Sequence, residues 1–348
     1  PSSTPAPLPN PASLRSAERW LRQSEPVVVP TETVYGLAAL ARDRAGVERV
    51  FQIKGRPADN PLIAHVSDLE QARALGQLGP LAEELARSFW PGPLTLVVDA
   101  REALPWLSAG LDSIALRLPS HAFMRALIER TGPIAAPSAN LSGRPSPTQA
   151  SHARADLAGL VPLIVDGGAL QHGLESTVVD ARSSSPRLLR PGAVTVEAIE
   201  AALGLSLLAV EAGDSARSPG MKYRHYSPHA ELWVYPLPQA SGAPAAEPGA
   251  LIDADCRRLL AEGRRVGVIA ARPPAATSTF TMPASATDVA RSLFDWLRRC
   301  DELALDVILI EGVVAAGVGR AVMDRLLRAA SVVRRAPEAT AGHERNSR

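Results

Sequence analysis

The 348-residue chain has little cysteine, almost no net charge and no long apolar run. Its two cysteines, Cys256 and Cys300, lie far apart without a CxxC pair, so they fit a reducing compartment and are expected to be buried core residues. A formal net charge of +1 argues against strong attraction of the whole protein to nucleic acid or acidic membranes. No apolar run approaches the length of a membrane span, so we expect a cytoplasmic protein with no membrane contact.

The composition is typical of a soluble globular protein with two domains. The apolar fraction is 46% and the charged fraction is 21%. The N-terminal sequence PSSTPAPLPNP has neither a basic start nor an apolar stretch, so we interpret it as a disordered lead and not as a signal peptide. The predicted divisions are a lead over 1–11, a catalytic domain over 12–208, a linker over 209–229, a C-terminal α/β domain over 230–335 and a tail over 336–348.

The C-terminal part alternates short apolar strands with amphipathic helices, a pattern that favours a small parallel α/β domain. Strands are expected over 231–235, 266–270 and 307–310, and helices over 287–299 and 319–330. A glycine-rich stretch between the last strand and the last helix lacks the GxGxxG spacing and the Lys-Ser or Lys-Thr pair of a phosphate loop. It is therefore weak evidence for nucleotide binding.

The linker has an unusual content for an inert spacer, because it carries tyrosine, histidine and basic residues. His225 and His229 are four residues apart, as zinc ligands on a helix can be, but Pro228 lies between them and no third ligand is evident. The sequence therefore predicts no metal site built from the protein's own ligands.

Residues 26–66 place polar groups where apolar strands end. The run Val27–Val29 has the length and β-branched composition of a buried strand, and a cluster of Thr, Glu and Tyr follows it at 31–35. A helix-like segment leads to Lys54-Gly55-Arg56-Pro57, in which two cations flank a glycine, and a second apolar strand carries His65. These residues alone indicate an anion-binding cleft.

Further polar groups follow other predicted strands. Arg117 lies inside the apolar strand 113–119 and needs an anionic partner, which is either a substrate carboxylate or an internal salt bridge. Residues 145–148 are expected to start a helix, where Ser146 serves either as part of an anion site or as an ordinary N-cap. Arg190 closes another apolar run.

Four stretches carry a resemblance to a known family: PTETVYGL, KGRPADNPLIAHV, SPGMKYRHYSP and EGVVAAGVGRAVMDRLLRAAS. Together they resemble the YrdC-like family, the threonylcarbamoyl-AMP synthases, in its long two-domain form. The resemblance implies a YrdC-like twisted open sheet with flanking helices, followed by a smaller Rossmann-like parallel α/β domain. It also implies synthesis of threonylcarbamoyl-adenylate from L-threonine, bicarbonate and ATP, with release of pyrophosphate, for the threonylcarbamoyladenosine modification of tRNA.

The same resemblance assigns roles to residues of this sequence. Lys54 and Arg56 are implied to be catalytic. ATP is implied to bind Arg56, Asn60, Ser113, Ser138, Asn140, Ser146, Arg190 and the linker residue Tyr226, to which Tyr223 is a weaker alternative. Threonine is implied to bind Thr33, His65, Arg117, Ala136 and Ser176. Mg²⁺ is expected to accompany ATP, and the product is expected to pass to a tRNA threonylcarbamoyl-transferase complex, whereas direct tRNA binding stays open. Residues 218–228 are expected to form a lid over the cleft.

Two alternatives belong to other classes. A non-catalytic RNA-binding protein could use the same cations on a phosphate backbone, but the cations are few and no surface of mixed aromatic and basic residues is apparent. A carbamoyl-handling enzyme of the hydrogenase-maturation kind would carry additional acylphosphatase and zinc-finger modules, and this sequence has neither.

Overall fold

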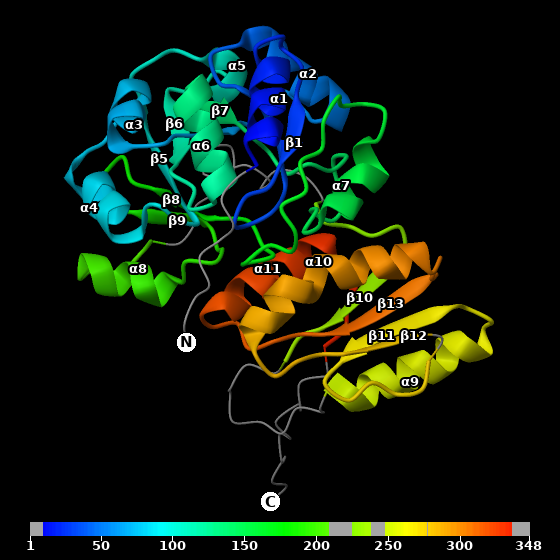
Figure 1. The fold of residues 1–348 in the computed structure, drawn as a ribbon. Helices are drawn as coiled ribbons and strands as arrows, with labels where there is room; N and C mark the ends of the chain where they lie inside the picture. The colour runs from blue at the N-terminus through cyan, green and yellow to red at the C-terminus, as the bar shows by residue number, and fades with distance from the viewer. Residues whose placement is uncertain (1–9, 209–224, 238–247, 277, 336–348) are drawn as a thin grey trace, which may run out of the picture.

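The computed structural model describes residues 10–208, 225–237, 248–276 and 278–335. The predicted tail, most of the predicted lead and linker, Tyr223 and lid residues 218–224 lie outside these ranges. Figure 1 shows two α/β domains along the chain, with the C-terminal one formed by the yellow to red segments. No helix in the described ranges is long and apolar enough to cross a membrane.

Within the described residues the first domain is built on a nine-stranded mixed sheet in the order β1-β2-β7-β3-β6-β5-β8-β9, with β4 paired to β5. Its strands are β1 (Val27–Val29), β2 (Gly36–Leu40), β3 (Ile63–His65), β4 (Gly76–Gln77), β5 (Leu94–Ala100), β6 (Ser113–Arg117), β7 (Ile134–Ala135), β8 (Thr177–Asp180) and β9 (Arg187–Arg190). Its helices are α1 (Pro11–Leu21), α2 (Arg44–Lys54), α3 (Leu69–Leu75), α4 (Pro80–Phe89), α5 (Pro105–Ser108), α6 (Ala122–Thr131), α7 (Ala150–Leu157) and α8 (Val196–Leu203).

Helices cover both faces of this sheet because its central strands are apolar on both sides. Successive side chains of β1 point to opposite faces of the sheet, so they belong to two different apolar clusters. Val27 and Val29 pack with the apolar residues of α1 and α6, whereas Val28 belongs to the larger cluster that α2, α3, α4 and α5 cover. The expected twisted sheet with flanking helices is confirmed.

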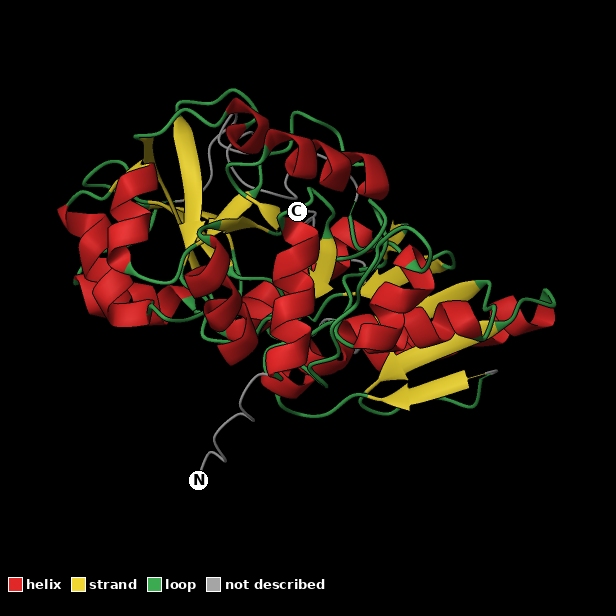
Figure 2. Cartoon of the chain, turned by 45° about the horizontal axis from the view of Figure 1, so that its top comes forward, coloured by secondary structure: helices red, strands yellow, loops and turns green. Residues whose placement is uncertain are grey.

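The second domain has a parallel five-stranded sheet in the order β12-β11-β13-β10-β14. The strands are β10 (Glu231–Tyr235), β11 (Val266–Ala270), β12 (Ser278–Thr281), β13 (Val307–Glu311) and β14 (Val332–Val333), and the helices are α9 (Pro248–Ala261), α10 (Ala286–Glu302) and α11 (Val318–Ala329). Figure 1 shows α10 and α11 on the face of this sheet that is turned toward the first domain, and α9 on the opposite face. Figure 2 shows helices packed against the strands throughout the chain. The predicted parallel α/β domain is confirmed, and Cys256 and Cys300 are buried free cysteines inside it.

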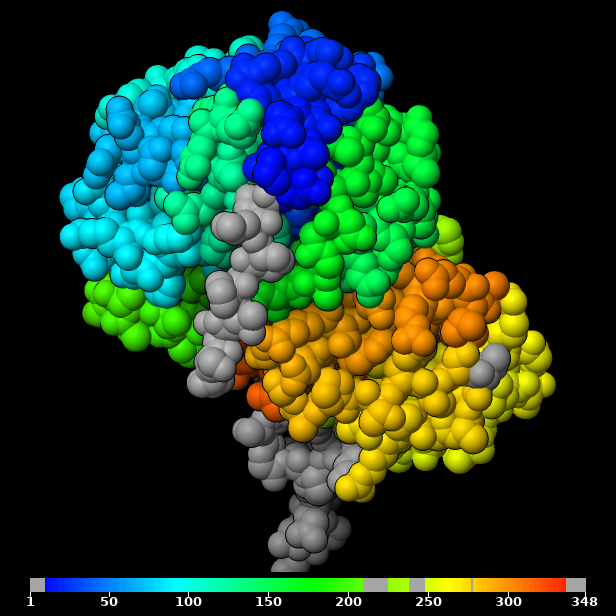
Figure 3. Space-filling view, viewed as in Figure 1, coloured from blue at the N-terminus to red at the C-terminus, as the bar shows by residue number. Residues whose placement is uncertain are grey.

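The two domains share an apolar core at their boundary. Val34 and Leu174 of the first domain pack in one cluster with Leu293 and Phe294 of α10 and Leu326 of α11. The space-filling view shows the orange α10 region pressed against the green segments of the first domain (Figure 3). Apolar surface of the first domain and apolar surface of the second domain are therefore removed from water in the same contact when the protein folds.

Some predicted elements were wrong or absent. The helix expected from residue 145 begins only at Ala150, with Gln149 as its N-cap, so Ser146 lies in the preceding loop. Residues 163–165 add only an isolated bridge to the sheet, between Val28 and Ile164. Neither β2 nor α9 was predicted, because β2 directly follows a polar loop and contains Gly and Ala, which have low strand propensity.

Candidate active site

One cavity gathers most of the residues that the sequence singled out. It lies where the sheet of the first domain meets the segment at 225–226. The predicted residues that line it are Thr33, Lys54, Arg56, His65, Arg117, Ala136, Ser138, Asn140, Ser146, Ser176, Arg190 and Tyr226. Residues drawn from strand ends far apart in the sequence therefore face a single space.

Two predicted residues do not line this cavity. Ser113 starts β6 opposite Asp99, whereas Arg117 at the other end of the same strand reaches the cavity. Asn60 is buried beside it, and its backbone carbonyl accepts a hydrogen bond from Arg56 Nε at 3.1 Å. A role for Asn60 in holding Arg56 follows directly from this contact.

Lys54 is buried and Arg56 is partly buried, and the hydrogen bonds of both cations go to neutral backbone carbonyls. Lys54 is the last residue of α2, and Gly55, at φ 57°, turns the chain in the left-handed conformation that glycine favours. Lys54 Nζ donates to the carbonyls of Ser138 and, at 2.6 Å, of Asn140, while Arg56 Nη2 donates to the carbonyl of Pro61 at 2.9 Å. Burial lowers the pKa of Lys54 well below its usual value and that of Arg56 to about 10. An anionic ligand would relieve this unfavourable burial of charge.

Arg117 has an internal partner as well as a place in the cavity. Its Nη2 lies 2.7 Å from Glu32 Oε1, its Nη1 donates to Thr33 Oγ1 at 3.0 Å, and both charged side chains are almost fully buried. Burial alone would raise the pKa of Glu32, but the Arg117 charge and the hydrogen bond from the Ser120 amide hold it at about 2. The internal salt bridge, one of the two interpretations of Arg117, is therefore present, and no role was predicted for its partner Glu32.

His65 lies beside Arg117 because β3 and β6 run parallel with these two residues in register. Burial and the neighbouring arginine lower the pKa of His65 to about 3, so its ring is neutral near pH 7. Within the described residues, His65 Nδ1 and Asn140 Oδ1 are buried without a hydrogen-bond partner, and both side chains line the cavity. Buried polar atoms of this kind call for a ligand or water.

Arg190 and Ser176 line another side of the cavity. Arg190 ends β9 and reaches across to the start of β8, where it donates to the carbonyl of Ser176 at 3.0 Å and to Ser176 Oγ at 3.2 Å. Ser176 Oγ in turn lies 2.8 Å from Thr95 Oγ1 of β5. Burial lowers the pKa of Arg190, as it does for Lys54 and Arg56.

The turn after β9 depends on Gly192. A methyl group at this position would lie 2.3 Å from the amide nitrogen of Thr177 and 2.6 Å from the carbonyl oxygen of Glu175. We therefore expect Gly192→Ala to displace the 175–177 backbone and to lower the free energy of unfolding by about 2 kcal/mol. Chemical denaturation measures this loss. Gly79→Ala is the matched control, since nothing lies within 4 Å of its methyl position, and equal stabilities of the two variants would contradict the expectation.

The sequence missed Glu175 and Arg325, because no local pattern marks a pair separated by 150 residues. Glu175 lines the cavity and accepts hydrogen bonds from Ser146 Oγ at 2.5 Å and from Arg325 Nε of α11 at 2.8 Å. Tyr226 closes the cavity nearby with a backbone φ of 66°, and its ring stacks on Phe294 of α10 with centroids 5.4 Å apart. Side chains of the second domain thus support two groups that line the cavity.

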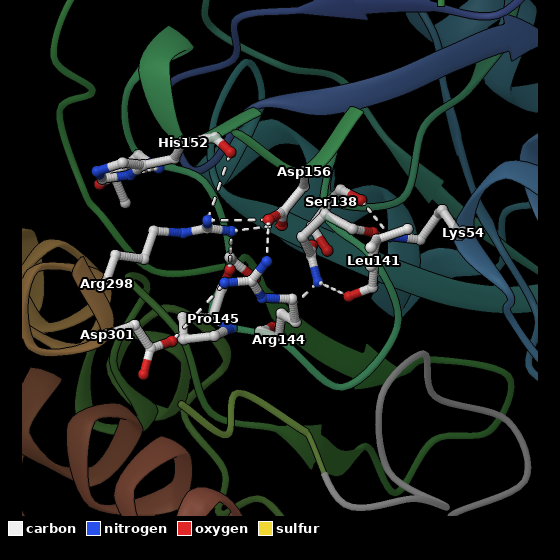
Figure 4. A network of polar contacts seen from close by, with 12 residues as sticks. Lys54, Ser138, Leu141, Arg144, Pro145, His152, Asp156, Arg298 and Asp301 are labelled. Carbon is white, nitrogen blue, oxygen red and sulfur yellow. Dashed lines mark hydrogen bonds and ion pairs between the residues drawn. The ribbon is translucent and has the colours of Figure 1, made fainter. Parts of the chain in front are cut away.

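A second polar network joins the domains beside the cavity (Figure 4). Arg298 of α10 lies 2.8 Å from the fully buried carboxylate of Asp156 and also donates to the carbonyl of Pro145. Arg144, which lines the cavity, lies 2.7 Å from the same aspartate. This network ties the loop that carries Ser146 to the second domain.

Comparisons with known proteins place this architecture in a family. Residues 19–192 match the Sua5, YciO and YrdC model described as "Telomere recombination", and residues 194–331 match the model described as "Threonylcarbamoyl-AMP synthase, C-terminal domain". The chain belongs to the Sua5/YciO/YrdC family, in its two-domain form.

Relatives that match over most of the chain are named threonylcarbamoyl-AMP synthase. The Pyrococcus abyssi protein is 45% identical over 323 residues, with 91% of this chain and 93% of the relative covered, and the Bacillus subtilis protein is 42% identical over 340 residues, with 92% and 94% covered. A shorter Mycobacterium tuberculosis relative, named putative threonylcarbamoyl-AMP synthase, is 38% identical and covers 55% of this chain and 88% of its own length. The chain is accordingly an enzyme of the nucleotidyltransferase type.

A solved structure supports the same assignment. The structure of Pyrococcus abyssi Sua5 complexed with L-threonine has a TM-score of 0.86 and 42% sequence identity, with 92% of this chain and 96% of that chain covered. The likeness extends over both domains. A non-catalytic RNA-binding protein, the alternative from another class, is therefore set aside.

Proposed function

We propose that this enzyme joins L-threonine, bicarbonate and ATP into threonylcarbamoyl-adenylate and releases pyrophosphate. The observation that carries the proposal is the single cavity in which Arg117, His65 and Ser176 face the same space as Arg56 and Asn140. An amino acid and a nucleotide can then lie side by side. The product would serve the threonylcarbamoyladenosine modification of tRNA, in the cytoplasm, after transfer to a tRNA threonylcarbamoyl-transferase complex.

The amino acid half of the cavity is built around Arg117. A guanidinium can bind the threonine carboxylate through paired N–H groups and leave the amine free to react. Thr33, Ser176 and the Ala136 backbone supply hydrogen-bonding groups for the remaining polar atoms. Because the ring of His65 is neutral, it offers a hydrogen bond without competing for the carboxylate charge.

The nucleotide half is built around Lys54, Arg56 and Arg190, with Ser138, Asn140, Ser146 and Tyr226 beside them. Cations whose pKa values are lowered by burial gain from a polyanionic ligand, because its negative charge offsets the cost of removing them from water. Asn60 acts indirectly in this half through its contact with Arg56. Ser113 stays a predicted ATP ligand, at the far end of β6 from the cavity.

The chemistry that follows is chiefly positioning and charge stabilisation. The threonine nitrogen forms a bond either to the carbon of CO₂, with loss of a proton, or to the carbon of bicarbonate, with breakage of a C–O bond and loss of water; both routes give a carbamate. A carbamate oxygen then attacks the α-phosphorus of ATP, and the bond to the β-phosphate bridging oxygen breaks, so that pyrophosphate leaves with the electron pair. Lys54 and Arg56 stabilise the negative charge that accumulates on the leaving group, and no covalent intermediate with the protein is required.

Mg²⁺ is expected to accompany ATP. No group of three or more His, Cys, Asp and Glu side chains suited to a metal ion occurs in the described ranges, and the cavity carboxylate Glu175 already accepts from Ser146 and Arg325. Mg²⁺ commonly keeps phosphate oxygens and waters as its main ligands, so these residues fit an ion brought by the nucleotide. Such an ion would neutralise part of the phosphate charge.

Pyrophosphate release tests the proposal. The full-length protein is incubated with ATP and Mg²⁺, with and without L-threonine and bicarbonate, and pyrophosphate and threonylcarbamoyl-adenylate are quantified. Release that depends on both co-substrates supports the proposed reaction. Release that ignores them, or salt-sensitive tRNA binding without any release, contradicts it.

Tyr226 is expected to cover the nucleotide, as part of the proposed lid. Replacing it with alanine removes an aromatic surface worth about 1–3 kcal/mol in stacking on a base, so the affinity for ATP should fall about tenfold. The yield of the adenylate, a mixed anhydride, should also fall because water reaches it. Calorimetric titration with ATP and product quantification measure both effects. Tyr226→Phe, which keeps the ring, should behave like the unmodified enzyme, whereas unchanged values for Tyr226→Ala would discard the lid.

A further inference from the structure

Arg325 is a fully buried arginine on α11 that the proposed reaction does not use directly. Its Nε donates to Glu175 Oε2 at 2.8 Å, and its Nη1 lies 2.6 Å from Asp324 Oδ2. Its guanidinium carbon lies 5.3 Å from the centroid of the Tyr226 ring. One side chain of the C-terminal domain therefore contacts two groups that line the cavity of the catalytic domain.

The contact with Glu175 sets the hydrogen-bonding state of Ser146. The hydroxyl of Ser146 donates to Glu175 Oε1, while the other carboxylate oxygen is held by Arg325. Burial alone would raise the pKa of Glu175, but the nearby charges of Arg325 and Arg190 and the bond from Ser146 keep it lowered. Glu175 is consequently an anion inside a cavity that is proposed to bind another polyanion.

The contact with Tyr226 is the second effect of the same guanidinium. A cation over the face of a tyrosine ring is attracted by the negative charge of that face. The ring also stacks on Phe294, so two side chains of the second domain hold Tyr226 in its left-handed backbone conformation. Because non-glycine residues seldom adopt this conformation, such support is needed to keep the ring at the cavity.

We propose that Arg325 is a positioning residue for the nucleotide, through which the C-terminal domain compensates the charge of Glu175 and fixes Ser146 and Tyr226. This inference rests on the proposed binding of ATP in the cavity. Without Arg325, the buried Glu175 carboxylate would lose its hydrogen-bonded counter-ion while it faces the phosphates, and Tyr226 would lose its cation. The amino acid half of the cavity, around Arg117 and His65, lies outside these contacts.

The test uses full-length Arg325→Met, Arg325→Lys and the double variant Glu175→Gln/Arg325→Met. Calorimetry gives Kd for ATP and for L-threonine separately, and steady-state pyrophosphate release gives kcat and both KM values. The matched control is Arg320→Gln, which removes another arginine of the same helix that pairs with a glutamate of the first domain. That pair, with Glu197, is exposed and lies 3.3 Å apart, away from the cavity.

Arg325→Met is expected to weaken ATP binding about tenfold or more, the usual effect of losing a hydrogen bond to a charged group, with threonine Kd changed less than about twofold. The lysine variant should recover part of the loss. The double variant should recover most of it, because it removes the carboxylate charge together with its hydrogen-bonded counter-ion. Arg320→Gln should match the unmodified enzyme in every measurement.

Other outcomes overturn the inference. An unchanged ATP Kd in folded Arg325→Met shows that the contact is not used, and an equal loss of ATP and threonine affinity, without recovery in the double variant, shows a structural role alone. If Arg325→Met does not fold, the lysine and double variants decide by the same criteria. The Kd measurements require no turnover, so they can fail or succeed independently of the pyrophosphate assay that tests the proposed reaction.

Discussion

Lys54→Gln is expected to lower threonine-dependent pyrophosphate release about 100- to 1000-fold, the typical effect of removing one preorganised electrostatic group. The ammonium group of Lys54 is buried at the end of α2, next to Arg56. Glutamine keeps an N–H donor for the carbonyls of Ser138 and Asn140 but carries no charge. Initial rates at saturating ATP and threonine measure the effect.

Lys54→Met separates the charge from the hydrogen bonds. Methionine leaves the two buried carbonyls without their donor, which should cost a further 1–3 kcal/mol or so of unfolding free energy. Glutamine should retain most of that stability. If the glutamine variant keeps more than a tenth of the activity, the lysine charge is not part of the chemistry. If both variants unfold equally easily, the carbonyl contacts do not hold the 138–140 loop.

Arg117→Met is expected to destabilise the enzyme by about 3–5 kcal/mol near pH 7, because Glu32 is left as a buried charge without its counter-ion. The threonine KM should rise at least 100-fold in any variant that folds, since the paired donors for the carboxylate are lost. Glu32→Gln/Arg117→Met should be less destabilised, as it removes both charges. Denaturant unfolding and threonine titration measure the two effects.

The pH dependence of the unfolding free energy that Glu32 contributes should have opposite signs in the unmodified enzyme and in Arg117→Met. In the unmodified enzyme the pKa of Glu32 is about 2 against an ordinary 4.5, so its contribution of about 3 kcal/mol is complete above pH 4.5 and is lost as the pH falls toward 2. In Arg117→Met, burial raises that pKa, so the contribution is present at low pH and is lost as the pH rises through the new value. Unfolding free energies at pH 4 and 6 distinguish the two slopes. Parallel slopes would show that Arg117 does not control Glu32.

Much of the cavity could be predicted from sequence because its residues sit at strand ends in recognisable motifs. The Lys54-Gly55-Arg56 turn works through local geometry, a helix end followed by a left-handed glycine, and the structure keeps both cations at the cavity. His65 and Arg117 come together because their strands pair in parallel. The parallel character of the second domain was equally accessible, since strands there alternate with helices.

Other features depend on pairings that no local pattern encodes. The sequence left open whether Arg117 pairs internally, and its partner Glu32 lies 85 positions earlier, across three intervening strands of the sheet order. The strand β2 pairs antiparallel with β1 through a polar loop that reads as irregular chain. Glu175 and Arg325 come from different domains, so only the packing of α11 against the first domain brings them within hydrogen-bond distance.

The placement of arginines from α10 and α11 against carboxylates of the first domain has a consequence for protein engineering. A chain that ends at residue 208 would lose the pairing of Arg298 with Asp156 and of Arg325 with Glu175, and the two carboxylates would keep only their partners within the first domain. A one-domain variant, of about the size of the shorter mycobacterial relative, should therefore also need substitutions at Asp156 and Glu175. The apolar surface around Leu174, which the second domain covers, should need polar replacements. Removal of the C-terminal domain without these substitutions should give a protein that is insoluble or does not bind ATP.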